Sequence, residues 1–339
     1  MNSRNIVFTK PNTAQLLTED CRQPQANEVL VKLAVSSVSS GTERANLVGD
    51  PRVSIYSEFN ATEAVFPRRV GYSSSGTVIQ VGEGVTKVQV GDRVAVGGSY
   101  HCEYVTLEEK KVHPIEDISF EDAALFYIAT FPLAAIRKCR LEIGESAMVM
   151  GLGVLGLVAV QLLKTAGAAP LIAVDPNPAK REKALAIGAD YALDPLAPDF
   201  AATVKSITDG GVRVAIEVTG ITAGLDGALD CMARFGRVAL LGCTRHSDLN
   251  IDYYGKVHGP GITLVGAHTM ARPEHESSPG WWTEKDDMQT MKRLVQSGRL
   301  SLKALVDEWY SPTEAPKVYH RLAAEKTFPV VQFDWRLLE

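Results

Sequence analysis

The spacing of hydrophobic and polar residues divides the chain into a strand-rich first part and a second part where strands alternate with helices. Short β-branched runs separated by glycine, typical of strands, occur at residues 29–35, 76–81 and 85–96. From about residue 121, apolar helical segments alternate with short apolar runs at residues 148–150, 171–175, 214–218, 238–242 and 262–266. This alternation predicts βαβ units and a parallel sheet.

The last part of the chain predicts one helix and one strand. Residues 285–297 form a helical pattern that Gly298 ends, and a strand-like run follows at residues 328–333. The apolar face of the predicted helix consists of Met288, Met291, Leu294 and Val295.

The composition is that of an ordinary globular protein and excludes several functions. A length of 339 residues suggests two domains, since a domain has roughly 100–200 residues. The 35 basic and 40 acidic residues give a formal net charge of −5. A chain without a broad basic field is poorly suited to nucleic acid or anionic lipid, so we expect a small-molecule substrate and neither of those partners.

Cysteine usage and apolar runs predict a cytoplasmic protein. The five cysteines are odd in number and form no CxxC pair, so we expect free thiols in a reducing compartment. The first residues lack the apolar core of a secretory signal. The longest apolar stretch, residues 147–163, is too short and too rich in glycine to span a membrane.

That apolar stretch is better explained as a dinucleotide-binding turn between a strand and a helix. The first glycine of such a turn permits the tight bend, the second lets the backbone approach a pyrophosphate, and the third lets the helix pack on the strand. The N–H groups at the start of the helix then face the phosphates. The predicted cofactor-binding residues of the turn are Gly151, Gly153, Val154, Leu155 and Gly156.

A carboxylate follows where a ribose-binding residue is expected. Asp175 ends the next predicted strand, about 20 residues beyond the turn. Its negative charge would repel a 2′-phosphate, which favours NAD over NADP. Lys180 and Arg181 follow closely and would soften this repulsion, so NADP stays possible, although such charges are often only solvated. The alternative for the whole motif is a glycine turn in another kind of α/β protein.

These segments together resemble the medium-chain dehydrogenase/reductase family over nearly the whole chain. The resemblance rests on the β-rich first part, the glycine turn, and the sequences Val-Gly-Asp-Arg-Val at 90–94 and Ala-Ile-Gly-Ala-Asp at 186–190. Residues 40–44, Ser-Gly-Thr-Glu-Arg, are similar to the zinc-alcohol-dehydrogenase-related branch.

The resemblance implies an α/β protein with a mostly-β GroES-like domain and a doubly wound parallel sheet of the Rossmann type. The GroES-like substrate domain would comprise residues 1–127, the Rossmann domain residues 128–268, and residues 269–339 would return to the substrate domain. It further implies an NAD(P)-dependent dehydrogenase or reductase with its active site between the domains, assembled as a homodimer or homotetramer.

The departures from the family pattern concern zinc. Two ligand positions of zinc-dependent members match Ser40 and Tyr72, and the third falls near Phe126, whereas a zinc site needs thiolate, imidazole or carboxylate ligands. The structural four-cysteine lobe of many relatives is represented by Cys102 alone. We therefore predict that this protein binds neither a catalytic nor a structural zinc ion.

Without a metal, the substrate domain must supply a group that transfers the proton. Thr42 matches the hydroxyl of the family's proton relay, and Tyr72 offers a phenol that can donate a proton or hold an oxyanion. His101 offers an imidazole, the side chain most often used for proton transfer near neutral pH. The alternatives are a turn-capping Thr42, a space-filling Tyr72, and a His101 that lies on the surface or is satisfied in the core. Glu43 completes the candidate catalytic set, with a structural ion pair to Arg44 or Arg69 as the favoured alternative.

Further ligand contacts are predicted in the Rossmann domain, because ligands lie at the carboxyl ends of strands in such sheets. The candidate cofactor-binding residues are Thr130, Thr219, Gly242, Cys243, Ala267 and His268. Trp281 and Trp282 follow the last strand and are candidates for a substrate-binding wall that stacks on a flat ring. They would equally serve as a dimer contact or as a cap on the core.

These observations favour a zinc-independent, NAD-dependent oxidoreductase that interconverts a secondary alcohol, polyol or sugar-like, and a ketone. The first alternative is an NAD(P)H-dependent quinone or enone reductase, in which an acid such as Tyr72 protonates the enolate. The second is a dinucleotide-binding protein without turnover, because catalytic decay would also remove three ligand positions.

Overall fold

The structure is a computed structural model that describes the chain except for residues 54–65, 246–247, 249 and 339. It forms two compact units, which we describe separately. Unit 1 consists of Met1–Ile128 and Met288–Glu339, and unit 2 consists of Ala129–Asp287. The first boundary lies beside the predicted one, whereas unit 2 extends beyond residue 268 to Asp287.

Unit 2 contains a six-stranded parallel sheet with the strand order β11-β10-β9-β12-β13-β14. The first strand lies inside the sheet and the order reverses between β9 and β12, which is the doubly wound Rossmann arrangement. The predicted α/β class is confirmed. The strands are β9 (Ala147–Met150), β10 (Leu171–Val174), β11 (Tyr191–Leu193), β12 (Val212–Glu217), β13 (Met232–Leu240) and β14 (Thr263–Gly266).

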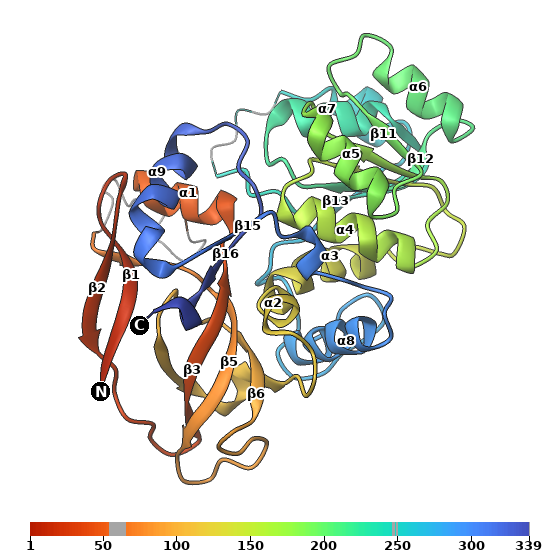
Figure 1. The fold of residues 1–339 in the computed structure, drawn as a ribbon. Coiled ribbons are helices and arrows are strands. Elements are labelled where there is room, and N and C mark those ends of the chain that lie inside the picture. Colours follow the sequence, from red (N-terminus) through yellow and green to blue (C-terminus); the bar gives the residue numbers. More distant parts are fainter. Residues whose placement is uncertain (54–65, 246–247, 249, 339) are drawn as a thin grey trace. The chain divides into compact units, whose positions relative to one another are not determined.

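Helices cover this sheet, and Figure 1 shows α4, α5 and α6 (yellow-green to green) gathered around it. The chain of β9 and β10 is buried along its whole length, which explains the unbroken apolar sequence of both strands. Helix α4 packs on β9 and β10, and α7 packs on β12 and β13. The helices are α3 (Phe126–Lys138, whose first residues belong to unit 1), α4 (Val154–Thr165), α5 (Pro178–Ala186), α6 (Phe200–Ile207) and α7 (Thr222–Asp230), with a π-helical turn η2 (Tyr254–His258).

Unit 1 is mostly β, as predicted. One sheet has the order β2-β1-β4 and a larger one the order β15-β16-β3-β5-β6-β8, with β7 paired to β3. The strands are β1 (Asn2–Lys10), β2 (Thr13–Asp20), β3 (Glu28–Ser37), β4 (Arg68–Arg69), β5 (Ser73–Val81), β6 (Arg93–Gly97), β7 (Tyr104–Glu108), β8 (Val112–Pro114), β15 (Glu308–Tyr310) and β16 (Val331–Asp334). Figure 1 shows the C-terminal β16 (blue) beside the N-terminal β3 (red), and the two strands pair antiparallel.

The helices of unit 1 position its candidate site. Helix α1 begins directly after β3, and α9 packs against α1 and β2. The pattern that predicts a helix at 285–297 is confirmed by α8, after which Gly298 has φ +69°. The helices are α1 (Ser40–Val48), α2 (Phe120–Ala123), α8 (Glu284–Gln296, whose first residues belong to unit 2) and α9 (Ala315–Ala324), with 3₁₀ turns η1 (Glu109–Lys111), η3 (Lys303–Leu305), η4 (Pro312–Glu314) and η5 (Trp335–Leu337).

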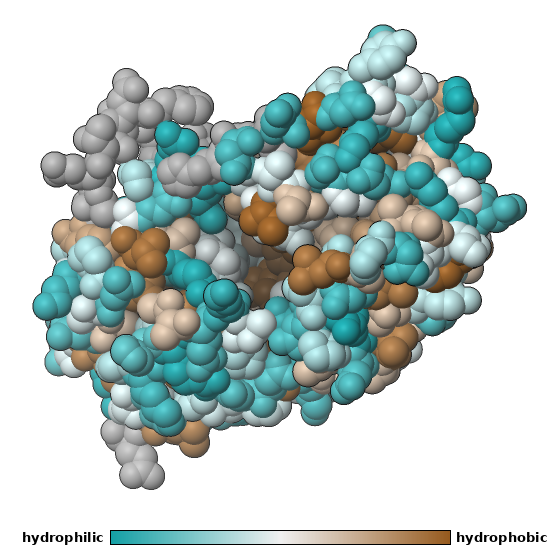
Figure 2. Space-filling model, turned by 90° about the horizontal axis from the view of Figure 1, so that it is seen from above, coloured by the Kyte–Doolittle hydropathy of each residue, from teal (hydrophilic) through white to brown (hydrophobic). Residues whose placement is uncertain are grey.

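Among the described residues, no helix has the length and apolar character needed to cross a bilayer. The face shown in Figure 2 is largely hydrophilic, with hydrophobic residues in small separate groups. Single exposed apolar residues of this kind are normal on a folded protein.

Candidate active site

The glycine turn lies between β9 and α4, where the sequence predicts it. Gly151 has φ +100°, and a Cβ on Gly156 would lie 1.9 Å from the Gly151 carbonyl oxygen. A Cβ on Gly153 would meet no atom within 4 Å, so the backbone there borders open space. Gly153 is also the N-cap residue of α4, and it provides no side-chain cap. The first N–H groups of α4, including those of Val154 and Leu155, therefore lack intrahelical partners and suit an anion such as a pyrophosphate.

Asp175 follows β10 and is held beside this turn. Its Oδ2 atom accepts a hydrogen bond from the Leu152 N–H at 2.9 Å, and its Oδ1 atom accepts one from the Asn177 N–H at 2.9 Å. Lys180 Nζ lies 3.9 Å from Oδ2, and Arg181 donates to the Asp175 carbonyl oxygen at 2.7 Å. The structure thus brings the predicted ribose-binding carboxylate and the predicted phosphate-binding turn together.

A second carboxylate at a strand end was missed by the sequence analysis. Glu217 ends β12 and is buried, and its Oε1 atom accepts hydrogen bonds from the N–H and hydroxyl groups of Thr219 and from the Gly220 N–H. Burial raises the pKa of Glu217, opposed by these hydrogen bonds. An acidic residue at the carboxyl end of an apolar run, as at Asp175, was the signal that could have found it.

The loops after β12 and β13 approach each other closely. A Cβ on Gly242 would lie 2.3 Å from the Gly220 nitrogen, and the Gly242 N–H donates to the Glu217 carbonyl oxygen at 2.8 Å. Thr219 is exposed beside them, and Cys243 follows with an exposed free thiol. Three predicted cofactor-binding residues, Thr219, Gly242 and Cys243, therefore lie at neighbouring strand ends.

The end of β14 carries positive charge. Ala267 is buried, and the half-buried His268 accepts a hydrogen bond at Nδ1 from the Met270 N–H at 3.2 Å. Burial, followed by the positive charges of Lys138 and Arg245, lowers the pKa of His268. Both effects favour the neutral form of its imidazole.

Thr130 and the two tryptophans contact basic side chains of unit 2. Thr130 is fully buried in α3, and its hydroxyl accepts a hydrogen bond from Arg272 at 3.4 Å. The Arg137 guanidinium lies 3.7 Å from the centre of the Trp282 ring, and Lys138 Nζ lies 4.9 Å from that of Trp281. One face of each ring is thus covered, which favours the alternative of a cap on the core. Trp281 remains 44% exposed.

These contacts explain where unit 2 ends. Arg137 of α3 donates to the fully buried carboxylate of Asp287, and Lys138 donates to the Gly266 carbonyl oxygen at 3.2 Å. Arg272 is also largely buried, with Nη1 3.9 Å from Asp287 Oδ2. Residues 269–287 are therefore fixed to α3 by charge pairs, which a hydropathy pattern does not reveal.

In unit 1, Glu43 and His101 form a buried pair. His101 has no exposed surface, and its Nε2 atom lies 3.2 Å from both carboxylate oxygens of Glu43. His101 Nδ1 lies 2.7 Å from Ser36 Oγ. Glu43 also accepts hydrogen bonds from the Tyr319 hydroxyl at 2.6 Å and the Ser39 N–H at 2.7 Å. Because these polar groups have partners inside the core, the geometry favours the core role for both residues.

The expected ion-pair partners of Glu43 were wrong. Arg69 pairs with Glu19 at 2.8 Å, and Arg44 donates to the carbonyl oxygen of Glu325 at 2.8 Å. Glu43 instead lies on the buried side of α1, at 1% exposure, and meets His101 there.

Tyr72 and Thr42 are half-buried and retain surface that a ligand can reach. The Tyr72 hydroxyl donates to Ser39 Oγ, and its ring lies edge-on to that of Tyr127 with centroids 5.9 Å apart. Thr42 lies in the first turn of α1, where its carbonyl oxygen accepts from Asn46 at 3.0 Å. Within the described part of the chain, the Thr42 hydroxyl makes no hydrogen bond.

The three residues at the family's ligand positions do not fit a zinc ion. Phe126 is buried and has no donor atom, and the Tyr72 phenol is already bonded to Ser39. Ser40 contributes only a hydroxyl, whereas zinc in proteins takes sulfur, imidazole and carboxylate ligands. Leaving aside the undescribed residues, no three His, Cys, Asp or Glu side chains are grouped so that they could hold a metal ion. Burial raises the pKa of the Cys102 thiol to about 12, which disfavours its thiolate.

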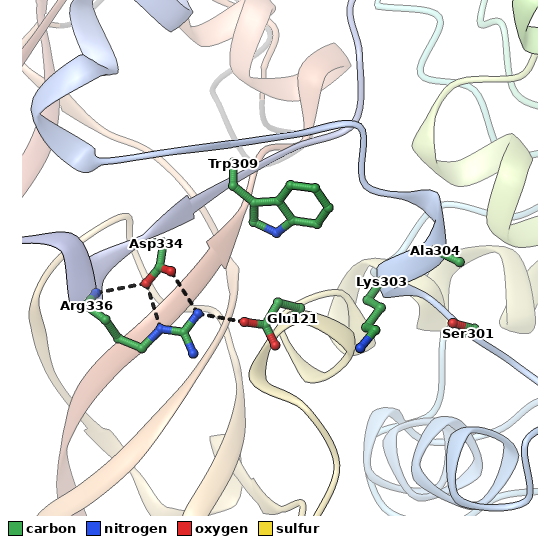
Figure 3. Close-up of a pocket in the computed structure, with 7 residues that line it drawn as sticks. All are labelled: Glu121, Ser301, Lys303, Ala304, Trp309, Asp334 and Arg336. Carbon is green, nitrogen blue, oxygen red and sulfur yellow. Dashed lines mark hydrogen bonds and ion pairs between the residues drawn. The ribbon is translucent and has the colours of Figure 1, made fainter.

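A separate hollow of about 480 Å³ in unit 1 includes none of the predicted residues. Figure 3 shows that one wall is formed by Arg336, which bonds to Asp334 at 2.8 Å and to Glu121 at 2.6 Å. The lining residues are Glu121, Ser301, Lys303, Ala304, Trp309, Asp334 and Arg336. Both of its carboxylates are paired with Arg336, so this hollow holds no unpaired acidic side chain among its lining residues.

Comparisons with known proteins agree with this division into two parts. Residues 25–122 match the family model of the alcohol dehydrogenase GroES-like domain, and residues 154–279 match that of zinc-binding dehydrogenase. L-threonine 3-dehydrogenase of Pyrococcus horikoshii is 28% identical, over 96% of this chain and 97% of its own length. D-guloside 3-dehydrogenase of Escherichia coli is 26% identical, over 93% and 95% respectively.

A third relative, (R,R)-butanediol dehydrogenase of Bacillus subtilis, is 29% identical over 68% of this chain and 75% of its own. Among solved structures, benzyl alcohol dehydrogenase from Acinetobacter calcoaceticus has the same fold, with a TM-score of 0.83 and 22% identity over 98% of this chain and 99% of its own. The chain therefore belongs to the medium-chain, zinc-type alcohol dehydrogenase family, with a GroES-like and a Rossmann domain, and is an NAD(P)-dependent dehydrogenase of that family.

Proposed function

We propose that this enzyme uses NAD to interconvert a secondary alcohol, polyol or sugar-like, and the corresponding ketone, without a catalytic zinc ion. The observation that carries the proposal is the Asp175 carboxylate held at 2.9 Å from the Leu152 N–H, within the glycine turn. A carboxylate at this place binds the ribose hydroxyls of NAD and repels the 2′-phosphate of NADP. Lys180, at 3.9 Å, reduces this repulsion only in part.

The nicotinamide ring, when bound, accepts or gives a hydride, so the chain must handle the accompanying proton. Tyr72 is the candidate for this role, because it is half-buried and occupies the position where zinc-dependent relatives bear a ligand. Its phenol would donate a proton to the developing alkoxide during ketone reduction, and its conjugate base would accept one during alcohol oxidation. Thr42 offers a second hydroxyl, for the substrate oxygen or the cofactor ribose.

The substrate class is supported by the relatives. Those described above are named as dehydrogenases of threonine, a guloside and a butanediol, which are hydroxylated compounds of small size. We retain a homodimer or homotetramer in the cytoplasm as the expected assembly and location. Size-exclusion chromatography with light scattering tests the assembly.

Fluorescence titration with NADH tests the cofactor assignment. Asp175→Ala should weaken NADH binding roughly 10–100-fold, because hydrogen bonds to a charged group contribute about 1.5–3 kcal/mol. Glu182→Ala is the matched control, since Glu182 is an exposed carboxylate on α5. The affinity of this control should not change. Unchanged NADH affinity in Asp175→Ala would contradict the assignment.

A substrate panel tests the reaction class. We expect NAD-dependent oxidation of secondary alcohols or polyols, and a loss of roughly 10²–10⁴-fold in kcat for Tyr72→Phe. Reduction of enones or quinones with no activity on alcohols would replace the proposal by the double-bond reductase. NADH binding without turnover on the whole panel would replace it by a non-catalytic dinucleotide-binding protein.

A further inference from the structure

Ser39 occupies the N-cap position directly before helix α1, yet its hydroxyl does not cap the helix. A serine at an N-cap usually accepts a hydrogen bond from an N–H group in the first helical turn. Here no such bond forms, and the Ser39 hydroxyl accepts a hydrogen bond from the Tyr72 phenol instead. The chain thus gives up a local stabilising contact and uses the hydroxyl for a residue of the candidate site.

The backbone of Ser39 is fixed by the buried pair described above. Its N–H donates to Glu43 Oε1 at 2.7 Å, and its carbonyl oxygen accepts from the Glu43 N–H at 2.9 Å. Glu43 is held in turn by His101 and Tyr319. Ser39 itself is only 5% exposed, so its hydroxyl has a defined position.

The backbone next to Tyr72 packs against His101, a member of the same buried pair. Gly71 has φ +95°, and a Cβ there would lie 2.7 Å from the backbone nitrogen of His101. The Tyr72 carbonyl oxygen accepts from the Gly98 N–H at 2.8 Å, and Tyr127 packs on the ring. The phenol is therefore oriented at both ends, by its backbone and by Ser39.

We propose that Ser39 is a positioning residue that holds the Tyr72 phenol for proton transfer; this inference rests on the proposed function, in which Tyr72 carries the proton. During reduction, the hydride goes to the carbonyl carbon and the Tyr72 proton goes to the carbonyl oxygen. Ser39 keeps its own proton, and its hydroxyl turns to donate a hydrogen bond to the phenolate that results. A hydrogen bond to an ion is stronger than one between neutral groups, so Ser39 favours the transfer.

Steady-state kinetics of single variants provide the first test, with the best substrate from the panel. Ser39→Ala and Ser39→Gly both remove the hydroxyl, and glycine is itself an acceptable N-cap. Each should lower kcat roughly 10–100-fold, while KM and the NADH dissociation constant stay within about 2-fold. Ser39→Thr retains the hydroxyl and should restore most of kcat. Thermal unfolding identifies any variant that is simply unfolded.

Ser75→Ala is the matched control. It removes another buried hydroxyl of unit 1, which donates to the Phe120 carbonyl oxygen at 2.7 Å and makes no hydrogen bond to Tyr72. Its kcat should match that of the wild type. An equal loss of kcat in Ser75→Ala and Ser39→Ala would show a general packing effect and overturn the inference.

A double mutant separates this inference from the proposed function. In the Tyr72→Phe background, Ser39→Ala should cause no further loss of kcat, because the bond is already absent. A full multiplicative loss would overturn the positioning role. If Tyr72→Phe loses activity and Ser39→Ala does not, the inference fails alone. If Tyr72→Phe keeps full activity, the role proposed for Tyr72 fails, and the inference with it.

Discussion

The cofactor turn of unit 2 and the hydroxyl site of unit 1 are built in different ways. At the turn, backbone conformation makes the site: Gly151 needs a positive φ, and Gly156 has no room for a Cβ. In unit 1, side chains make the site, and Ser39, Tyr72 and His101 come from separate segments. A backbone-built site depends on a few glycines, whereas a side-chain site depends on the surrounding core.

The largest effect should come from a single methyl group at the turn. Gly156→Ala places a Cβ 1.9 Å from the Gly151 carbonyl oxygen, so β9 and α4 must separate. We expect NADH binding to weaken at least roughly 100-fold, about 2.7 kcal/mol, together with a lower melting temperature of the protein. Fluorescence titration and calorimetry measure the two effects.

Gly153→Ala is the matched change, because its Cβ would meet no protein atom within 4 Å. It should leave the melting temperature unchanged and weaken NADH binding by roughly 10-fold, since the methyl group points to where the pyrophosphate must approach. Equal changes in NADH affinity and melting temperature in the two variants would contradict the conclusion that close backbone contact at Gly156 builds the turn.

The next effect tests the core beneath the site of unit 1. Glu43→Ala leaves the Tyr319 hydroxyl, the His101 imidazole and the Ser39 N–H without their partner. The free energy of unfolding should fall by about 2–4 kcal/mol in urea titrations, with NADH affinity retained. Thr42→Ala, on the same helix, should change it by less than about 0.5 kcal/mol. Equal stability of the two variants would show that Glu43 is not a core residue.

The smallest effect concerns a pair of neighbouring carboxylates in unit 2. Burial raises the pKa of Asp287 to about 6, although Arg137 and Arg272 oppose the shift. Between about pH 4 and 6 the folded state therefore binds more protons than the unfolded state, and this group's contribution to stability falls as pH rises. Asp287→Asn should remove this pH-dependent decrease in the free energy of unfolding, which amounts to at most about 3 kcal/mol. Urea unfolding at pH 4 and 6.5 measures it.

The pKa of the neighbouring Asp286 is shifted in the opposite direction. Hydrogen bonds from Ser277, and then from Thr283, lower its pKa. Its contribution is present above the unfolded pKa and is lost as pH falls. Asp286→Asn should therefore change the pH dependence of the free energy of unfolding in the direction opposite to Asp287→Asn. The same sign in both variants would contradict the role assigned to burial.

The same contrast explains what sequence alone predicted. The glycine turn and Asp175 occupy one short stretch with a known spacing, so the sequence alone predicts the strand, the turn and the carboxylate beside it. The partner of Glu43 could not be placed in this way, because Tyr319 lies 276 residues away. Arg137 and Asp287, 150 residues apart, set the end of unit 2 for the same reason. Local patterns do not encode such pairs.

The role of a single hydroxyl group is even harder to predict from the sequence. Ser39 looks in the sequence like an ordinary helix cap, and only the structure shows its bond to Tyr72. Strands β9 and β10 were predicted because their apolar runs are buried along their whole length, whereas the short β11 has an exposed start and was not predicted.

The most direct test of the central claim is the zinc content of the active enzyme. The purified protein is dialysed against a chelator, and zinc per chain is measured by mass spectrometry beside turnover in the same sample. The account predicts far less than one zinc per chain with turnover unchanged. One tightly held zinc per chain, whose removal abolishes turnover and whose return restores it, would contradict the account.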